Sequence, residues 1–147
     1  MTRASSYIAI VLAALIALAD GWLKALIISR PPQSGGRSGF IDVILHKNPG
    51  IAFDIPLPIS IIAPLTVIIC LWLGILVHRH WRTQRQVSVL AVTVILGAVG
   101  NLADRIINGF TTDYILLFGH SAINLADLLI IFGILGILWY TRNKKAR

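Results

Sequence analysis

Four long apolar stretches dominate this sequence, and each is close to the length that an α-helix needs to cross a lipid bilayer. Such a helix requires roughly 20 apolar residues. The chain is 56% hydrophobic and 13% charged, a balance that gives a water-soluble domain too little polar surface. We therefore expect an all-α membrane protein with one domain over residues 1–147 and four transmembrane helices, at about 6–28, 57–77, 87–103 and 122–140.

The first apolar stretch has a second interpretation. The sequence Ala-Leu-Ala at 17–19 follows Arg3 and a short apolar core, a pattern that is typical of a cleaved secretory signal peptide. The apolar pattern resumes after Asp20 and continues to Ile28. This continuation favours a full membrane span.

The basic residues predict how the chain crosses the membrane. The formal net charge is +7, but the basic residues cluster at the ends of the apolar stretches, which indicates membrane orientation and argues against nucleic-acid binding. The link 78–86 carries three arginines and the C-terminal tail carries four bases, so both are expected in the cytoplasm. The N-terminus then also lies in the cytoplasm, while 29–56 and 104–121 face the outside. Within the first outer segment, Phe40–Leu45 reads as a short strand of a small extracytoplasmic β-sheet.

Ionisable residues near a membrane span are disfavoured by about 3 kcal/mol on insertion scales, so each needs an explanation. Asp20 and Lys24 are four residues apart on the first predicted helix, which predicts an ion pair. Asn101, Asp104 and Arg105 share one face of the third, beside small residues that permit close helix packing. For both groups, a purely structural ion pair or packing seam is the alternative to a functional role.

Two further aspartates carry the chemistry that we expect. Asp127 follows Asn124 at the start of the fourth apolar stretch, and Asp113 lies in the preceding outer segment, so both carboxylates fall at the same membrane face. Two carboxylates that come close share one proton, and such a pair can hydrolyse a peptide bond without a metal or a covalent intermediate. We find no zinc-type histidine spacing and no Gly-x-Ser-x-Gly motif, so we expect no metal and no cofactor.

These residues occur in blocks that resemble the lipoprotein signal peptidase (signal peptidase II) family. The blocks follow in family order and span nearly the whole chain: Asp20-x-x-x-Lys24, Asn48-Pro-Gly-Ile-Ala-Phe53, Gly100-Asn101-Leu-Ala-Asp104-Arg105, Gly109-Phe-Thr-Thr-Asp113-Tyr-Ile115 and Asn124-Leu-Ala-Asp127. The run from Gly100 to Asp113, joined to Asn124–Asp127, is the most specific part of the resemblance.

The resemblance implies a fold, an activity and a set of site residues. It implies four transmembrane helices in the bacterial inner membrane and a β-sheet cradle after the first helix. The implied reaction is cleavage of diacylglyceryl-modified prolipoproteins before the lipid-bearing cysteine, within the membrane lipid and with no cofactor. Asp113 and Asp127 become the catalytic pair. The other implied roles are substrate positioning by Asn101, Arg105 and Asn124, support of Arg105 by Asp104, bracing of the site by Asp20 and Lys24, and a place beside the substrate for Asn48, Gly50 and Phe53.

The sequence also departs from the family pattern, and other functions compete. The segment 114–123 is shorter than expected, which predicts a trimmed flap over the site, and Pro49 and Asp54 replace residue types that are common there. A small proton-coupled transporter also uses intramembrane aspartates, but it favours polar groups near the midplane of the membrane. An inactive scaffold with the same fold is the third alternative, and retention of both aspartates and of every positioning residue argues against it.

Overall fold

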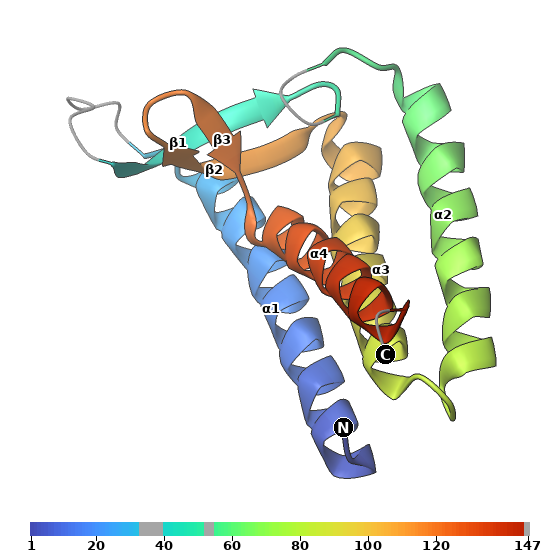
Figure 1. Cartoon of the computed structure of the whole chain (residues 1–147). Helices are drawn as coiled ribbons and strands as arrows, with labels where there is room; N and C mark the ends of the chain where they lie inside the picture. Colours follow the sequence, from blue (N-terminus) through green and yellow to red (C-terminus); the bar gives the residue numbers. More distant parts are fainter. Residues whose placement is uncertain (33–39, 52–54, 146–147) are drawn as a thin grey trace.

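Four helices form most of the molecule. The computed structural model describes residues 1–32, 40–51 and 55–145. The helices are α1 (Arg3–Ser29), α2 (Ile59–His80), α3 (Arg85–Asn108) and α4 (Leu125–Lys145), and a small sheet lies across one end of them (Figure 1). All four helices are long and apolar enough to cross a membrane. The expected four-helix membrane architecture is therefore confirmed.

Helix α3 is the centre of the bundle and packs against each of the other three helices. Helix α3 lies closest to α4, because glycines at the contact have no side chain that would hold the two helices apart. A Cβ atom added at Gly97 would lie 2.5 Å from the backbone oxygen of Ala126, and one added at Gly133 would lie 2.5 Å from Val94 Cγ2. The close contact expected near the small residues of α3 is thus present, and α4 is the partner.

The helix boundaries differ from those expected. The third span was expected to end at residue 103, but α3 continues to Asn108. Gly109 caps the helix with a positive φ of 80°, which glycine readily adopts. The expected start of the fourth span at 122 is wrong, because Ser121–Ile123 pairs with a neighbouring strand and α4 begins at Leu125. The first two spans, expected at 6–28 and 57–77, run over 3–29 and 59–80.

The sheet contains three antiparallel strands in the order β1 (Ile41–Asn48), β2 (Thr111–Leu117) and β3 (Ser121–Ile123). The strand expected near residues 40–45 is confirmed as β1. Strands β2 and β3 come from the connection between α3 and α4, for which no strand was predicted. Asp113 therefore lies in the middle strand, opposite His46 of β1, and the sheet fixes its position.

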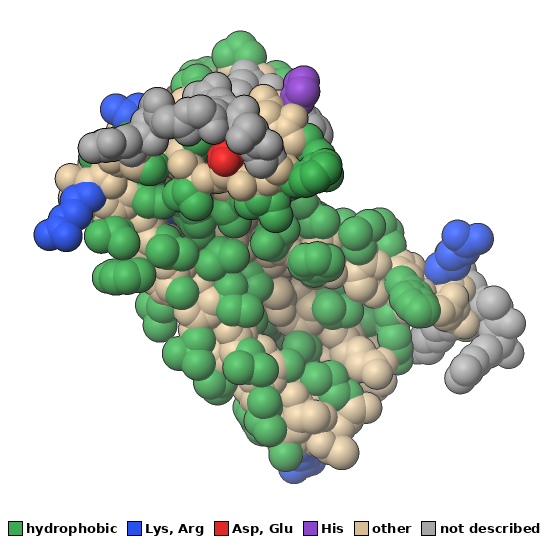
Figure 2. All heavy atoms as spheres, turned by 90° about the vertical axis from the view of Figure 1, so that its left-hand side faces the viewer, with side chains coloured by type: hydrophobic (Ala, Val, Ile, Leu, Met, Phe, Trp, Pro, Cys, Tyr) green, Lys and Arg blue, Asp and Glu red, His purple; other side chains and the backbone are tan. Residues whose placement is uncertain are grey.

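The pattern of burial is typical of a membrane protein, because large apolar side chains are exposed and the most buried side chains are polar. Large apolar side chains such as Leu18 and Trp22 are 71% and 65% exposed, and hydrophobic side chains cover the helical part in Figure 2. The largest side chains that are less than 2% exposed are all polar: Asn124, Thr111, Thr112, Asp20, Asp113, Ser6 and Ser88. Buried polar groups require hydrogen-bond partners. Most of these residues belong to the junction between the sheet and the helices.

Candidate active site

Asp113 and Asp127 line the same cavity beneath the sheet. The cavity has a volume of about 550 Å³ and is also lined by Asn48, Asn101 and Arg105. Asp113 is held by strand β2, and Asp127 lies in the first turn of α4. The structure therefore brings the two aspartates of the predicted pair to one site.

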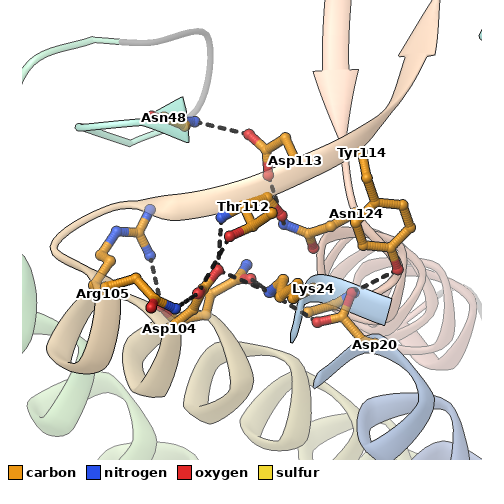
Figure 3. Close-up of polar contacts among 12 residues, drawn as sticks. Asp20, Lys24, Asn48, Asp104, Arg105, Thr112, Asp113, Tyr114 and Asn124 are labelled. Carbon is orange, nitrogen blue, oxygen red and sulfur yellow. Dashed lines mark hydrogen bonds and ion pairs between the residues drawn. The ribbon is translucent and has the colours of Figure 1, made fainter. Parts of the chain in front are cut away.

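Amide groups hold all four carboxylate oxygens of these aspartates. Asn48 Nδ2 donates to Asp113 Oδ2 at 3.1 Å, and Asn124 Nδ2 donates to Asp113 Oδ1 at 2.6 Å (Figure 3). Asn101 Nδ2 donates to Asp127 Oδ1 at 2.8 Å, and the backbone N–H of Asn124 donates to Asp127 Oδ2 at 3.2 Å. Each carboxylate is thus held in a fixed orientation from both sides.

The environment of Asp113 favours its protonated form. The Asp113 side chain is almost fully buried, and burial is the main reason why the pKa of this carboxyl group is raised to about 6. The negative charge of Asp127 adds to the increase, whereas the hydrogen bonds from Asn48 and Asn124 oppose it. A carboxyl group in this state can carry a proton near neutral pH and donate it to a substrate.

Lys24 links α1 to the rest of the site. Its Nζ atom lies 2.8 Å from Asp20 Oδ2, which confirms the expected ion pair, and it donates to Asn101 Oδ1 at 2.7 Å. Asp104 Oδ2 lies 3.7 Å from the same nitrogen. Lys24 therefore orients the Asn101 amide that holds Asp127.

Asp104 and Arg105 are adjacent in sequence but have separate contacts. Asp104 accepts from the backbone N–H of Thr112 at 2.6 Å and from Asn108 Nδ2 at 2.7 Å, and its negative charge also acts on the Arg105 guanidinium. The expected support of Arg105 by Asp104 stays a prediction. Arg105 Nη2 donates to the backbone oxygen of Gly50 at 2.7 Å. Asp104 therefore fixes the start of β2, and Arg105 holds the chain that follows β1.

Gly50 is required at its position because there is no room for a side chain. A Cβ atom there would clash with the backbone oxygen of Ile55. The Gly50 N–H donates to Asn48 Oδ1 at 2.9 Å, which orients the amide that reaches Asp113. Gly50 thus positions Asn48 and Arg105 together. Phe53 and Asp54 lie outside the described residues.

Two residues in the site were not singled out from the sequence. Thr112 donates its backbone N–H to Asp104, and Tyr114 places its hydroxyl between α1 and α4. Both flank Asp113 in a segment for which no strand was predicted. The alternation of side chains along a strand would have indicated that Tyr114 points away from Asp113 and needs a polar partner of its own.

In the described part of the chain, no group of three or more His, Cys, Asp or Glu side chains could hold a metal ion. The contacts described above build the site from paired carboxylates, amide donors and two basic side chains. The fold and the site together define a class of protein: a four-helix membrane protein whose helix ends and sheet enclose a pair of aspartates, one buried and one partly buried.

Comparison with known proteins places the chain in a family. The sequence model described as "Signal peptidase (SPase) II" matches residues 12–142. A lipoprotein signal peptidase of Azoarcus sp. is 35% identical over 69% of this chain and 62% of its own length. Proteins of the same description from Xanthomonas oryzae pv. oryzae and Moorella thermoacetica are 28% and 29% identical, over 97% and 87% of this chain and 93% and 89% of their own. The chain belongs to the signal peptidase II family, and is thus a multi-pass membrane peptidase.

Solved structures show the same fold. Two structures described as bacterial membrane enzymes superpose with TM-scores of 0.84 and 0.78, each at 20% identity. They match 99% and 96% of this chain and 92% and 94% of their own chains. The arrangement of four helices and a small sheet is therefore shared over almost the entire molecule.

Proposed function

We propose that this chain is an aspartic endopeptidase that removes the signal peptide from diacylglyceryl-modified prolipoproteins, cleaving before the lipidated cysteine. The observation that carries the proposal is the pair Asp113 and Asp127, which line one cavity with every carboxylate oxygen held by an amide donor. Membership of the signal peptidase II family supports a lipoprotein substrate.

The chemistry divides between the two aspartates. Asp127 accepts a proton from a water molecule while the water oxygen attacks the carbonyl carbon of the scissile bond. Asp113, whose pKa is raised to about 6, carries a proton below that pH and donates it as the C–N bond breaks and the amine leaves. The proton that Asp127 accepted then passes to Asp113. This transfer restores the starting state, in which the two carboxyl groups share one proton.

Arg105 is the residue best placed to hold the substrate backbone. It lines the cavity, and its Nη1 and Nη2 atoms each donate to a backbone oxygen, of Asn101 and of Gly50. These bonds use two of the five guanidinium N–H groups, so a further N–H of Nη1 or Nη2 can donate to a substrate carbonyl oxygen. The amides of Asn101 and Asn124, expected to bind substrate, already contact the aspartates, so we assign them to positioning the pair.

The cavity also suits a substrate that is held in the membrane. Beneath the aspartates it is lined by side chains of α2, α3 and α4: Ile62, Thr66, Ala98, Ile130 and Ile131. Apolar walls of this kind bind a hydrophobic signal segment with its cleavage site at the polar end. This arrangement supports an active site at the end of the bundle that the sheet covers, and the arginines at the opposite end favour the extracytoplasmic face for it.

The decisive experiment is incubation of the purified protein with a diacylglyceryl-modified lipobox peptide. We expect release of the product with a free lipidated cysteine N-terminus, and no cleavage of the unmodified peptide. Asp113→Asn and Asp127→Asn should each bind the peptide and lose cleavage on the order of 10³-fold, with little further loss in the double variant.

The matched control is Asp42→Asn, which changes a half-buried aspartate of β1 that is not among the residues lining the cavity. It should cleave at the parental rate, and a chelator should leave the parent protein active. Near-parental cleavage by either variant of the pair, or loss of cleavage on chelation, would contradict the aspartic mechanism.

A further inference from the structure

Tyr114 is buried directly beside Asp113 in strand β2, and its side chain reaches away from the cavity. Consecutive residues of a strand point to opposite faces, so Asp113 faces the cavity while Tyr114 faces α1 and α4 (Figure 3). The Tyr114 hydroxyl donates to Asp20 Oδ1 at 2.9 Å and accepts from the backbone N–H of Leu125 at 3.3 Å. One hydroxyl group thus contacts α1 and the first residue of α4.

The same turn of α4 carries the second aspartate. Asp20 Oδ1 also accepts from the backbone N–H of Ala126 at 3.2 Å, so Tyr114 and Asp20 together hold two successive N–H groups at the helix start. Asp127 is the next residue, and Asn124 precedes the turn. The position of Asp127 relative to Asp113 therefore depends on how this turn is fixed to β2.

The hydroxyl acts as a permanent donor. Burial and the negative charge of Asp20 raise the pKa of Tyr114 above its ordinary value, so the hydroxyl keeps its proton across the working range of pH. Its hydrogen goes to Asp20, and its lone pair remains available for Leu125. A phenylalanine would fill the same volume without either bond.

We propose that Tyr114 is a positioning residue whose hydroxyl sets the separation of Asp113 and Asp127 by fixing the first turn of α4 to β2 and α1. The proposal rests on the proposed aspartic peptidase activity. Tyr114 does not touch the cavity in this arrangement, so it acts through the two aspartates and not through the substrate.

Loss of the hydroxyl should change the chemical step more than substrate binding. In Tyr114→Phe the ring still packs, but the Leu125 N–H loses its partner and the turn can shift away from β2. Small misplacements of reacting groups lower rates strongly, so we expect kcat to fall by about 10- to 100-fold and KM to stay within about twofold.

The pH profile gives a second readout. Asp113 faces Asp127 of α4, Lys24 of α1, Arg105 of α3 and, across the sheet, His46 of β1. Burial and the negative charge of Asp127 raise the pKa of Asp113, and both effects weaken if the aspartates move apart and water enters. The alkaline limb of the activity profile should therefore move to lower pH in Tyr114→Phe.

The experiment compares the parent protein, Tyr114→Phe and the control Tyr7→Phe, which removes a hydroxyl from a tyrosine of α1 that is 57% exposed. Peptide binding stoichiometry gives the folded fraction, and kcat, KM and pH profile are measured with the lipidated peptide. The pH profiles of the parent and of Tyr114→Phe are measured again in a His46→Gln background. An alkaline limb that remains there does not come from the histidine. We expect Tyr7→Phe to match the parent.

Two results would overturn the proposal: a kcat and pH profile in Tyr114→Phe that match the parent, or a loss of activity that the folded fraction fully accounts for. Asp113→Asn, measured beside them, separates this failure from failure of the proposed function. If Asp113→Asn is inactive while Tyr114→Phe matches the parent, only the role of Tyr114 is wrong. If Asp113→Asn cleaves normally, the aspartic mechanism itself is wrong.

Discussion

Asp113 is the residue whose ionisation should control the alkaline limit of activity. Its pKa is raised to about 6, mainly by burial, so the protonated general acid is lost as the pH rises through that value. We expect a bell-shaped pH profile of kcat whose alkaline limb falls near pH 6, measured with the lipidated peptide. An alkaline limb that stays flat to pH 9 would contradict the assignment of Asp113 as the acid.

Asn48→Ala should move that limb in the direction opposite to Tyr114→Phe. The Asn48 amide donates to Asp113 Oδ2 and lowers the pKa of Asp113, so its removal should raise the pKa and shift the alkaline limb to higher pH. The measurement is the pH profile of kcat over the same range. A shift to lower pH would show that Asn48 acts on Asp113 in another way.

Lys24→Ala should destabilise the protein, because Asp20 is left buried without its ion-pair partner and Asn101 loses the contact that orients it. Breaking a buried pair costs about 3–5 kcal/mol, and the double variant Asp20→Asn/Lys24→Ala should recover part of that loss. Thermal unfolding in detergent gives the comparison. Equal stability of the parent and Lys24→Ala would mean that the pair contributes little.

At the residue scale, the sequence predicted which side chains lie together in the site, but not which groups each of them contacts. The i to i+4 spacing of Asp20 and Lys24 was enough to predict their ion pair, since both lie on one helix. The contacts of Asn101 and Asn124 with the aspartates depend on how α3, β2 and α4 meet, which no local spacing defines. A cross-element hydrogen bond is therefore the kind of feature that one sequence reveals least.

At the scale of elements, the seam between α3 and α4 should be sensitive to a single methyl group. Gly97→Ala places a Cβ atom 2.5 Å from the backbone oxygen of Ala126, and a backbone atom cannot move aside without displacing the turn that carries Asp127. We expect a loss of about 1–3 kcal/mol in stability together with reduced cleavage. Thermal unfolding and the peptide assay measure the two effects.

The matched control for this seam is Gly74→Ala in α2, where nothing lies within 4 Å of an added Cβ atom. It should be neutral or slightly stabilising, because alanine favours helix by about 1 kcal/mol over glycine. If both variants behave alike, close packing of α3 on α4 is not what holds Asp127. The small residues near 97 were enough to predict a seam, but they could not show which helix would fill it.

Element boundaries were the least predictable part of the fold. The apolar pattern alone could not distinguish the short strand Ser121–Ile123 from the start of a helix, because three residues are too few to show a period. Pairing with β2 decides the matter, and that pairing is a tertiary contact. The strand at β1 was predictable because it is longer and is bounded by turn residues.

At the scale of the whole molecule, the site and the basic connection lie at opposite ends. The sheet covers one end of the bundle, and the link between α2 and α3 closes the other (Figure 1). Because arginines are retained in the cytoplasm, reporters fused at residues 82 and 143 should appear cytoplasmic, and one fused at 118 extracytoplasmic. An extracytoplasmic reporter at 82 would place the site on the wrong side for a secreted substrate.

The nine residues from Asp104 to Thr112 have a consequence for how this chain can vary between relatives. Near the end of α3, Asp104 accepts a hydrogen bond from the backbone N–H of Thr112, and the chain turns at Gly109 between these two residues. The length of this segment is therefore fixed, since one inserted or deleted residue would turn Asp113 to the opposite face of its strand. The hairpin tip at Phe118–Gly119 lies beyond these contacts, and it can lengthen without altering the catalytic spacing. Insertions that adapt the enzyme to new substrates should accumulate at the tip, while the segment from 104 to 112 keeps its length.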